Sequence, residues 1–381
     1  MPLNTAIIGL SSSAITSWAA KAHLPPLSTS KGKSLFAITA LLNSSEDAAR
    51  AAASTFDLGS HSVKAYGSPE DLAADESVDF VICNTRVDKH LETTLPSLKA
   101  GKAAYIEWPI AKNLDEIQQL VDAAAASGKP VAVGLQGRYA PPVLKVKQVL
   151  QSGAIGKLLS TEIRAFGGTV NRDSLPPGLK YFADREIGGN PITIGAAHVI
   201  DFVQSVVGDV IPGSDHVHFQ IQRPRVGIKD PATGHVVETV TSTVPDLFSL
   251  HGSLPETDHV GSNASLVFYF ARGQPYPGDP PFTWTLNGEH GSIRLVAFGG
   301  SMLQADVYQL PVTISVHHFD TDTVEDIPWD WTAVQKEISI SGRSVQTCLY
   351  SLAEGGKDYV SLEDAAGRAR QIMGWLKTFH T

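Results

Sequence analysis

The sequence predicts an α/β protein in which a Rossmann domain with a doubly wound parallel sheet precedes an α+β domain built on a largely antiparallel open sheet. Over about the first 130 residues, short apolar runs alternate with alanine-rich helical stretches, which is typical of a parallel sheet covered by helices. After Gly137 the chain changes to strand-like runs joined by loops rich in Pro and Gly. Its 381 residues suffice for two cores, and we expect domains over 1–135 and 136–381.

The first domain is expected to alternate strands and helices. Its strands are the apolar runs at 6–8, 36–42, 80–82, 103–106 and 131–133. Its helices are the alanine-rich amphipathic stretches at 45–56, 89–100 and 113–127. Strands that are buried on both faces read as continuous apolar runs, so this pattern favours a parallel sheet with helices on both sides.

The second domain is expected to begin with a helix at 142–152 and to continue mainly as strands. The strand-like runs lie at 158–165, 217–222, 265–271, 292–296 and 312–317, with one helix at 194–207. The stretch 224–261 has few clear periods, and we expect a loop with at most one strand. Two helices, at 333–352 and 362–380, close the chain, and Ser361 with Asp364 forms a capping box for the second.

Composition and charge limit the kinds of partner that this protein is expected to bind. The formal net charge is −9 and no basic cluster compensates it, which argues against nucleic acid as the ligand. No apolar run reaches the roughly 18 residues that span a bilayer, and the N-terminus reads as a strand instead of a signal peptide. The two cysteines, Cys83 and Cys348, are too far apart in sequence to form a metal or redox motif. We expect a soluble cytoplasmic protein with no metal site and a small-molecule or protein partner.

Gly9 ends the first strand and begins a departure from the dinucleotide fingerprint G-x-G-x-x-G. Ser11 and Ala14 stand at the second and third glycine positions. We expect the segment formed by Ser11, Ser12, Ser13 and Ala14 to make a tight turn into a helix whose N-terminal amides face a phosphate. The alternative is a strand-turn-helix that binds no ligand.

The second strand ends in Asn43-Ser44-Ser45, where NAD-selective proteins carry a carboxylate for the ribose 2′-hydroxyl. The segment has no negative charge to repel a 2′-phosphate, and it offers hydroxyl groups and helix amides. It therefore favours NADP over NAD. The alternative is that Ser44 or Ser45 only caps the next helix, and the two roles are compatible.

Several short motifs occur in a fixed order along the chain. They are His23-Leu24-Pro25, Asn84-Thr85 with His90, Ala100-Gly101-Lys102 before Glu107-Trp108-Pro109, and Gly188-Gly189 before His198 and Asp201. Any one of them is a weak signal. In this order they resemble the Gfo/Idh/MocA family of dinucleotide-dependent oxidoreductases over essentially the whole chain. Within that family, Glu107-Trp108 and the segment 135–138 resemble the fungal group that includes the galactose-pathway repressor.

The resemblance implies a set of cofactor-binding residues and a quaternary structure. The cofactor residues are Gly9, Ser11, Ser12, Ser13, Ala14, Asn43, Ser44, Ser45, Asn84, Thr85, His90, Glu107, Trp108, Pro109 and Arg138. In this family the open sheet of the second domain binds the substrate and mediates dimerisation. The resemblance thus implies a homodimer, and we expect a broad apolar sheet face that needs such cover.

The usual proton-transfer groups of the family are missing here. Where the family has the lysine of Glu-Lys-Pro, this chain has Trp108, whose indole has no usable pKa. Ile194 replaces the acid that precedes His198, so His198 needs another partner, and Asp201 at i+3 is the candidate.

Three other residues are alternative proton donors. They are Tyr139, Lys180 and Tyr181. For each of them, as for His198, a structural or solvent-exposed role is the competing interpretation.

Two functional hypotheses follow. The first is an NADP-dependent oxidoreductase acting on a small carbonyl or alcohol in fungal secondary or carbohydrate-related metabolism. Trp108 favours a hydrophobic carbonyl substrate over a free sugar. The second is an NADP-binding regulatory protein that does not turn the cofactor over and docks onto another protein. Lyase-type or hydrolytic chemistry is a third, less favoured class.

Overall fold

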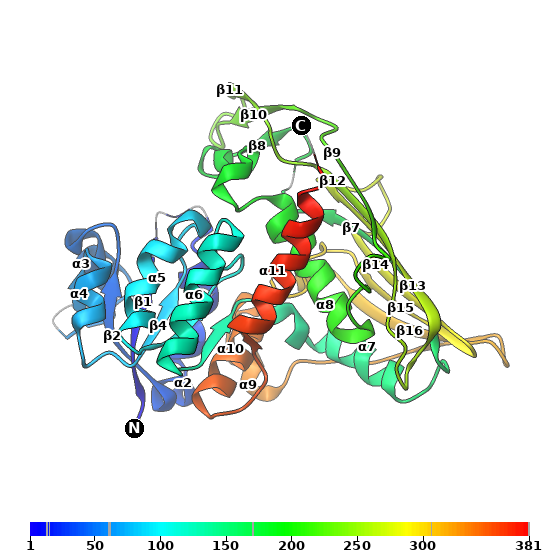
Figure 1. Ribbon diagram of the computed structural model, residues 1–381, viewed down its shortest axis with the longest axis horizontal. Coiled ribbons are helices and arrows are strands. Elements are labelled where there is room, and N and C mark those ends of the chain that lie inside the picture. The colour runs from blue at the N-terminus through cyan, green and yellow to red at the C-terminus, as the bar shows by residue number, and fades with distance from the viewer. Residues whose placement is uncertain (13, 15, 60–61, 170, 306, 380–381) are drawn as a thin grey trace. The chain divides into compact units, whose positions relative to one another are not determined.

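The computed structural model describes residues 1–12, 14, 16–59, 62–169, 171–305 and 307–379 (Figure 1). The chain divides into two compact units. Unit 1 contains Met1–Gln136, Glu186–Gly189 and Thr332–Met373, and unit 2 contains Gly137–Arg185, Asn190–Trp331 and Gly374–Thr381. As a functional division into cofactor and substrate domains, the boundary expected after residue 135 remains a prediction.

A seven-stranded sheet with the order β18-β6-β5-β4-β1-β2-β3 forms the centre of unit 1. Its strands are β1 (Leu3–Ile8), β2 (Phe36–Leu42), β3 (Lys64–Tyr66), β4 (Phe80–Cys83), β5 (Ala103–Ile106), β6 (Val131–Val133) and β18 (Val360–Ser361). All pairs are parallel except β18 with β6. Because β1 lies between β2 and β4, the strand order reverses there, and doubly wound sheets bind ligands at such a point. The predicted Rossmann sheet is confirmed.

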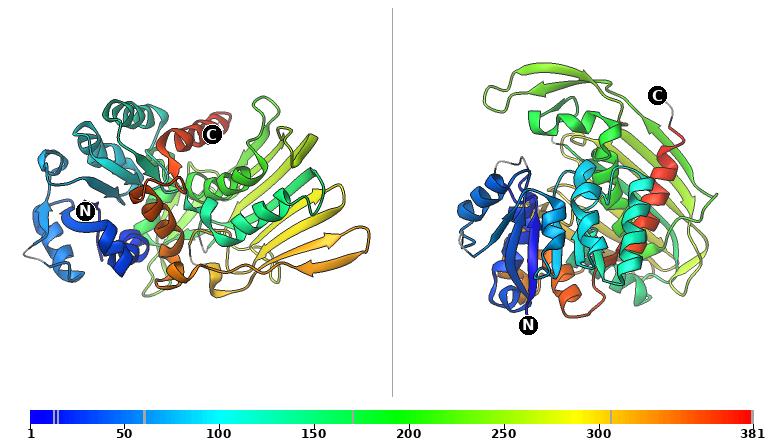
Figure 2. Two further views of the ribbon diagram at one scale, coloured as in Figure 1. Left: turned by 90° about the horizontal axis from the view of Figure 1, so that it is seen from below. Right: turned by 60° about the vertical axis from the view of Figure 1, so that its left-hand side comes forward.

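Helices surround the sheet of unit 1 (Figures 1 and 2). They are η1 (Ala19–His23), α1 (Leu24–Ser28), α2 (Ser30–Leu35), α3 (Glu46–Thr55), α4 (Pro69–Ala74), α5 (His90–Lys99), α6 (Leu114–Ser127), α9 (Ala333–Lys336) and α10 (Ile340–Ala353). Helices α4, α5 and α6 pack side by side, and α10 packs against η1, α1 and α2. The single helix predicted at 333–352 is wrong, because residues 337–339 separate α9 from α10. Helix α11 (Leu362–Leu376) begins where the helix at 362–380 was predicted to begin and ends at Leu376, and the strand β18 before it was not predicted.

Unit 2 contains an eight-stranded, largely antiparallel sheet and a smaller three-stranded one. The large sheet has the order β17-β16-β15-β14-β7-β13-β12-β9 and the small one β11-β10-β8. The strands are β7 (Leu158–Gly167), β8 (Ser174–Leu175), β9 (His216–Gln220), β10 (Arg225–Lys229), β11 (Val236–Thr241), β12 (Leu247–Ser253), β13 (Val260–Arg272), β14 (Phe282–Gly288), β15 (Gly291–Ala297), β16 (Val312–His318) and β17 (Thr323–Asp326). The expected loop at 224–261 is wrong, because it forms β10, β11 and β12.

One face of the large sheet is covered by α7 (Pro141–Gln151) and α8 (Ala197–Val207). Phe202 of α8 packs on Phe282 and Trp284 of β14, with ring centroids 5.8 and 6.2 Å away. The π-helix Pro191–Ala196 leads directly into α8, so the helix predicted at 194–207 is confirmed and begins earlier.

The other face of the large sheet is mostly polar. One cross-strand row runs Glu162, Thr285, Arg294 and Ser315 through β7, β14, β15 and β16. Glu162 and Arg294 are exposed, and Val267 is an apolar exception on β13. The broad apolar face that we expected is therefore not present on this side, and the homodimer remains a prediction.

Within the described residues, no helix is long and apolar enough to cross a membrane. The same residues include no cluster of three or more His, Cys, Asp or Glu side chains that could hold a metal ion.

Candidate functional site

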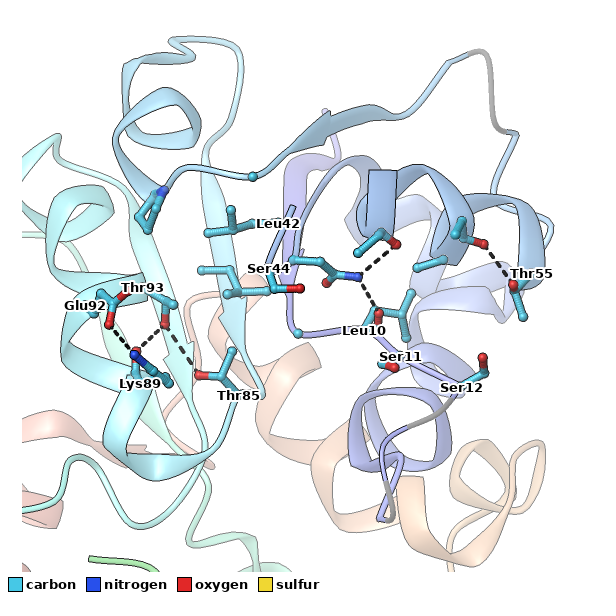
Figure 3. Close-up of a pocket in the computed structure, with 18 residues that line it drawn as sticks. Leu10, Ser11, Ser12, Leu42, Ser44, Thr55, Thr85, Lys89, Glu92 and Thr93 are labelled. Atoms are coloured by element: carbon cyan, nitrogen blue, oxygen red, sulfur yellow. Dashed lines mark hydrogen bonds and ion pairs between the residues drawn. The ribbon is translucent and has the colours of Figure 1, made fainter. Parts of the chain in front are cut away.

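A pocket of about 600 Å³ opens at the carboxyl ends of β1, β2 and β4 in unit 1 (Figure 3). Most side chains that line it are small or hydroxylic. The lining comprises Ile8, Gly9, Leu10, Ser11, Ser12, Leu42, Asn43, Ser44, Ala48, Ala51, Ala52, Thr55, Gly67, Pro69, Thr85, Lys89, Glu92 and Thr93. Lys89 and Glu92 are its charged members, and they pair with each other at 2.8 Å. The position at the strand-order reversal is where this fold binds dinucleotides.

Gly9 forms the floor of the pocket between β1 and β4. Its φ is +86°, and a Cβ there would lie 3.0 Å from Thr85 Cγ2 and 3.1 Å from the carbonyl carbon of Asn84. Its amide donates to the carbonyl of Leu42 at 2.9 Å. Only glycine tolerates both this φ and this contact, so the residue lets the turn after β1 pack closely against the segment that follows β4.

The loop after Gly9 differs from the predicted turn into a helix. The first described helical residue is Trp18, directly before η1, and the described residues 10–12, 14, 16 and 17 are not helical. Ser17 closes this loop, because its hydroxyl donates to the carbonyls of Ser11 at 2.9 Å and Ala14 at 3.0 Å. Ser11 and Ser12 line the pocket but do not begin a helix, which corrects that expectation. Ser13 lies outside the described residues.

The end of β2 is tied to both neighbouring segments by one side chain. Asn43 Nδ2 donates to the carbonyls of Leu10 at 2.9 Å and Ala48 at 3.2 Å. Its Oδ1 is buried, and no described group donates to it. Ser45 Oγ accepts from the Ala48 amide at 3.1 Å and caps α3, which confirms the predicted cap, whereas Ser44 is exposed and lines the pocket.

Glu107, which was expected to bind cofactor, is engaged inside unit 1. It is 8% exposed, and its Oε1 lies 2.5 Å from Nε2 of the fully buried His23. The His23 ring stands edge-on to Tyr105, with centroids 5.1 Å apart. Trp108, the next residue, is 7% exposed, and its peptide bond to Pro109 is cis.

His90 joins the start of α5 to two loops. Its Nε2 lies 2.9 Å from the Thr85 carbonyl and its Nδ1 3.1 Å from the Ile110 carbonyl. Burial lowers the pKa of His90. Both of its contacts are to carbonyl oxygens, which only accept, so a neutral ring donates to one of them. The Asn84 amide, just before Thr85, is also buried, and no described group bonds to it.

His198 and Asp201 both lie on α8 in unit 2 and are 5% and 1% exposed. The Asp201 carboxylate accepts a bidentate pair from Arg138, with Nε–Oδ2 at 2.9 Å and Nη2–Oδ1 at 2.6 Å. Arg138 is thus anchored within unit 2. Its predicted cofactor contact and the predicted role of Asp201 as the partner of His198 both remain predictions.

The other three candidate proton donors lie on two 3₁₀ helices, and all three residues belong to unit 2. Lys180 is on the 3₁₀ helix Pro177–Ala183, and its Nζ pairs with Glu238 of β11 at 2.6 Å, with about half of its side chain exposed. Tyr181, on the same 3₁₀ helix, packs edge-on against Phe182 at 4.9 Å and is half-buried. Tyr139 ends the 3₁₀ helix that begins at Gln136.

Sequence reasoning missed part of the pocket wall. Gly67 and Pro69 follow β3, and Lys89, Glu92 and Thr93 begin the helix after β4. The signal for β3 was a run of three residues, too short to separate from a loop, although Ser68 caps α4 with Pro69 at its first position.

The described pocket fits a dinucleotide. Gly9, Ser11 and Ser12 line the pocket after β1, where this fold binds a pyrophosphate, and the orphaned Asn43 Oδ1 is suited to accept a hydrogen bond from a ribose hydroxyl. The alanines of α3 leave space beside the helix for the adenosine half.

Comparisons with known proteins agree with this geometry. Residues 3–135 match the oxidoreductase family with an NAD-binding Rossmann fold, and residues 141–297 match the C-terminal domain of Gal80p. The dehydrogenase aclE of Aspergillus oryzae is 29% identical over 362 residues, which cover 93% of this chain and 90% of that protein. The galactose/lactose metabolism regulatory protein GAL80 of Saccharomyces cerevisiae is 26% identical over 309 residues, which cover 78% and 68%.

A solved structure shows the same fold. A super-repressor mutant of Gal80p from Saccharomyces cerevisiae superposes with a TM-score of 0.82 at 22% identity, covering 99% of this chain and 96% of that one. The two matched domains together account for most of the chain. The first domain of the chain therefore belongs to the Gfo/Idh/MocA oxidoreductase family with its NAD-binding Rossmann fold, and its second domain is of the Gal80p C-terminal type.

Proposed function

We propose that the protein is an NADP-dependent oxidoreductase that acts on a small carbonyl or alcohol. The observation that carries the proposal is the pocket at the ends of β1, β2 and β4, which has no carboxylate at the end of β2. Exposed Ser44 stands there, beside Asn43 with its orphaned oxygen. Bound NADP would supply hydride chemistry at its nicotinamide.

The residues of this chain take separate roles in the proposed reaction. The backbone at Gly9 and the hydroxyls of Ser11 and Ser12 hold the pyrophosphate. Asn43 Oδ1 accepts from a ribose hydroxyl, and Ser44 donates to the 2′-phosphate. These groups bind and orient the cofactor without taking part in proton transfer.

His198 is the first candidate for the proton donor in unit 2, because it is buried on a rigid helix. Tyr139 and Tyr181 are the next candidates. Lys180 is the weakest of the four, because its ammonium is already paired with Glu238 on an exposed surface. Trp108 offers an aromatic wall, which favours a hydrophobic carbonyl substrate.

The cofactor preference is tested by fluorescence titration with NADPH and NADH. Ser44→Asp places a carboxylate beside the 2′-phosphate, so we expect the Kd for NADPH to rise about tenfold or more while the Kd for NADH changes little. Ser44→Asn, which has nearly the same shape without the charge, is the control. Tighter binding of NADH than NADPH by the unaltered protein would refute the NADP preference.

Turnover is tested by following the absorbance of NADPH while adding a panel of apolar aldehydes and ketones together with free sugars. Oxidation by an apolar carbonyl supports the proposed enzyme. Oxidation only by sugars would refute the substrate class, and it would leave the oxidoreductase itself supported.

A second candidate function is a regulatory protein that binds NADP without turning it over and docks onto another protein. Two observations favour it: Trp108 cannot transfer a proton, and the chain is similar to the regulatory protein GAL80. Tight NADPH binding with no oxidation by any carbonyl of the panel is its expected signature.

We also propose a homodimer, which analytical ultracentrifugation would test. The polar row on the large sheet gives a specific variant. Arg294→Glu replaces the cation of this row with a second carboxylate, two strands from Glu162. A dimer formed through this face is therefore expected to dissociate at a higher protein concentration than the dimer of the unaltered protein.

A further inference from the structure

The segment Glu107–Ile110, which carries Trp108, is held at both ends by buried histidines from other elements. Before Trp108, His23 at the end of η1 contacts the Glu107 carboxylate, Nε2 to Oε1 at 2.5 Å. After Trp108, His90 at the start of α5 contacts the Ile110 carbonyl through Nδ1 at 3.1 Å. Both rings are buried, at 0% and 2% exposure. Trp108 therefore stands in a segment clamped on each side.

Glu107 is also in contact with β4 and with the segment after β6. Its amide donates to the carbonyl of Cys83 on β4 at 3.1 Å. On its other side lies Gly134, where a Cβ would come within 2.5 Å of Glu107 Oε2 and 3.1 Å of the Trp108 amide nitrogen. A carboxylate in this space needs its hydrogen bond from His23, because a buried charge without a partner is costly.

The order of the strands indicates which part of a dinucleotide would meet Trp108. The pocket covers the ends of β2, β1 and β4, and β5 is the next strand beyond β4. On a doubly wound sheet the adenosine half lies on the β2 side of the reversal point, and the nicotinamide half lies on the other side. Trp108 is the second residue after β5, directly after Glu107, so it lies at the nicotinamide end.

We propose that His23 and His90 are positioning residues that fix Trp108 so that its indole forms a wall against the nicotinamide ring. The inference rests on the dinucleotide binding proposed above. Neither histidine touches the cofactor. An aromatic side chain that is ordered before binding loses little conformational entropy on binding, which is how the clamp increases affinity for the nicotinamide half.

The test compares two ligands that differ at the nicotinamide end. NADPH carries the ring, and 2′-phospho-ADP-ribose has the same adenosine, 2′-phosphate and pyrophosphate without it. For His23→Leu, we expect the Kd of NADPH to rise about three- to tenfold and the Kd of the fragment to change less than about twofold. His23→Gln keeps a donor for Glu107 and is expected to restore most of the NADPH affinity.

His23→Leu leaves the Glu107 carboxylate unpaired, so its folding is checked by circular dichroism. The double variant His23→Leu/Glu107→Gln removes the clamp without a buried charge and is expected to give the same selective loss of NADPH affinity. This variant keeps the proposal testable even where His23→Leu alone fails to fold.

A double-mutant cycle asks whether His23 acts through Trp108. In a Trp108→Ala background, loss of His23 is expected to have no further effect on the ratio of the two Kd values. An undiminished effect in that background, or equal weakening of both ligands by His23→Leu, overturns the proposal. If the unaltered protein binds neither ligand, the proposed function fails, and the clamp loses its role with it.

Discussion

At the scale of single residues, Gly9 is a pocket position where both the backbone conformation and the available space exclude a side chain. Gly9→Ala places a Cβ 3.0 Å from Thr85 and also forces alanine to a φ of +86°. We expect the Kd for NADPH to rise about tenfold or more, because the backbone must shift away from the pyrophosphate position. Fluorescence titration measures the change.

Gly128, the C-cap of α6, provides a matched control for Gly9. Its φ is +64°, but a Cβ there would have no heavy atom within 4 Å. Gly128→Ala carries the same kind of backbone strain, about 1–2 kcal/mol of stability, without a collision at the pocket. Equal losses of NADPH affinity in the two variants would show that Gly9 acts through stability alone.

The pH dependence of stability is a second prediction at this scale. Burial lowers the pKa of His90, whereas in the unfolded chain the imidazole binds a proton near pH 6.5. Below about pH 6.5 the unfolded state therefore binds more protons, and the free energy of unfolding falls as the pH falls. In His90→Gln this fall is expected to be shallower.

Urea denaturation between pH 8 and pH 5 measures the effect at His90. His218→Gln, on the exposed side of β9, is the control and is expected to leave the slope unchanged. A slope that is the same in His90→Gln and in the unaltered protein would contradict the prediction.

At this scale the sequence predicted the helix cap at Ser45 better than the contacts that the site residues make. The cap at Ser45 depends on residues within one turn of the chain, and it is confirmed. Asn43 was placed in the site, but its bonds to Leu10 and Ala48 depend on which strands lie side by side, which local patterns do not contain. In the same way, the contact between Glu107 and His23 joins segments that are far apart in the chain.

At the scale of the elements, α3 begins with two adjacent serines of different function. Ser45 caps the helix, whereas Ser44 is exposed toward the pocket. We expect Ser45→Ala to lower the free energy of unfolding by about 1 kcal/mol and Ser44→Ala to leave it nearly unchanged. Thermal denaturation followed by circular dichroism compares the two variants, and similar losses in both would contradict the assignment.

Elements with a strong local signal were predicted, and those whose signal was short or interrupted were not. The helices α3, α5 and α6 lie within a residue or so of their predicted bounds. Strand β10 was missed because Gly227 separates its two buried residues, Val226 and Ile228, and the strand is bounded by turn residues, so only one alternation is visible. Its stability comes from pairing with β11 and β8, a tertiary effect.

At the scale of the whole molecule, unit 1 is completed by a segment from much later in the chain. Tyr350 of α10 donates to the Pro26 carbonyl at 2.8 Å, and Lys31 pairs with Glu354 at 2.8 Å. β18 pairs with β6 and covers that edge of the sheet. Composition and alternation predicted the Rossmann sheet but not the packing of this late segment onto it. The amphipathic pattern of α10 is ordinary and does not indicate which surface the helix packs against.

A fourth prediction follows from the packing of residues 332–373 onto residues 1–136. Residues 1–136 expressed alone are expected to be unstable and prone to aggregate, because the β6 edge and the apolar surfaces of α1 and η1 are uncovered. Joining residues 332–373 through a flexible linker is expected to restore a cooperative unfolding transition, measured by circular dichroism and gel filtration. A stable, monomeric 1–136 fragment would contradict it.

The late arrival of β18 also matters while the protein is being made. At about 5–20 residues per second, a ribosome needs roughly eleven to forty-six seconds to add residues 134–361, which end with β18, after it has finished β6. During that interval the nascent Rossmann sheet has an open edge that can pair with other chains. We therefore expect translation speed and chaperone supply, more than the equilibrium stability of the finished protein, to set its yield in a cell.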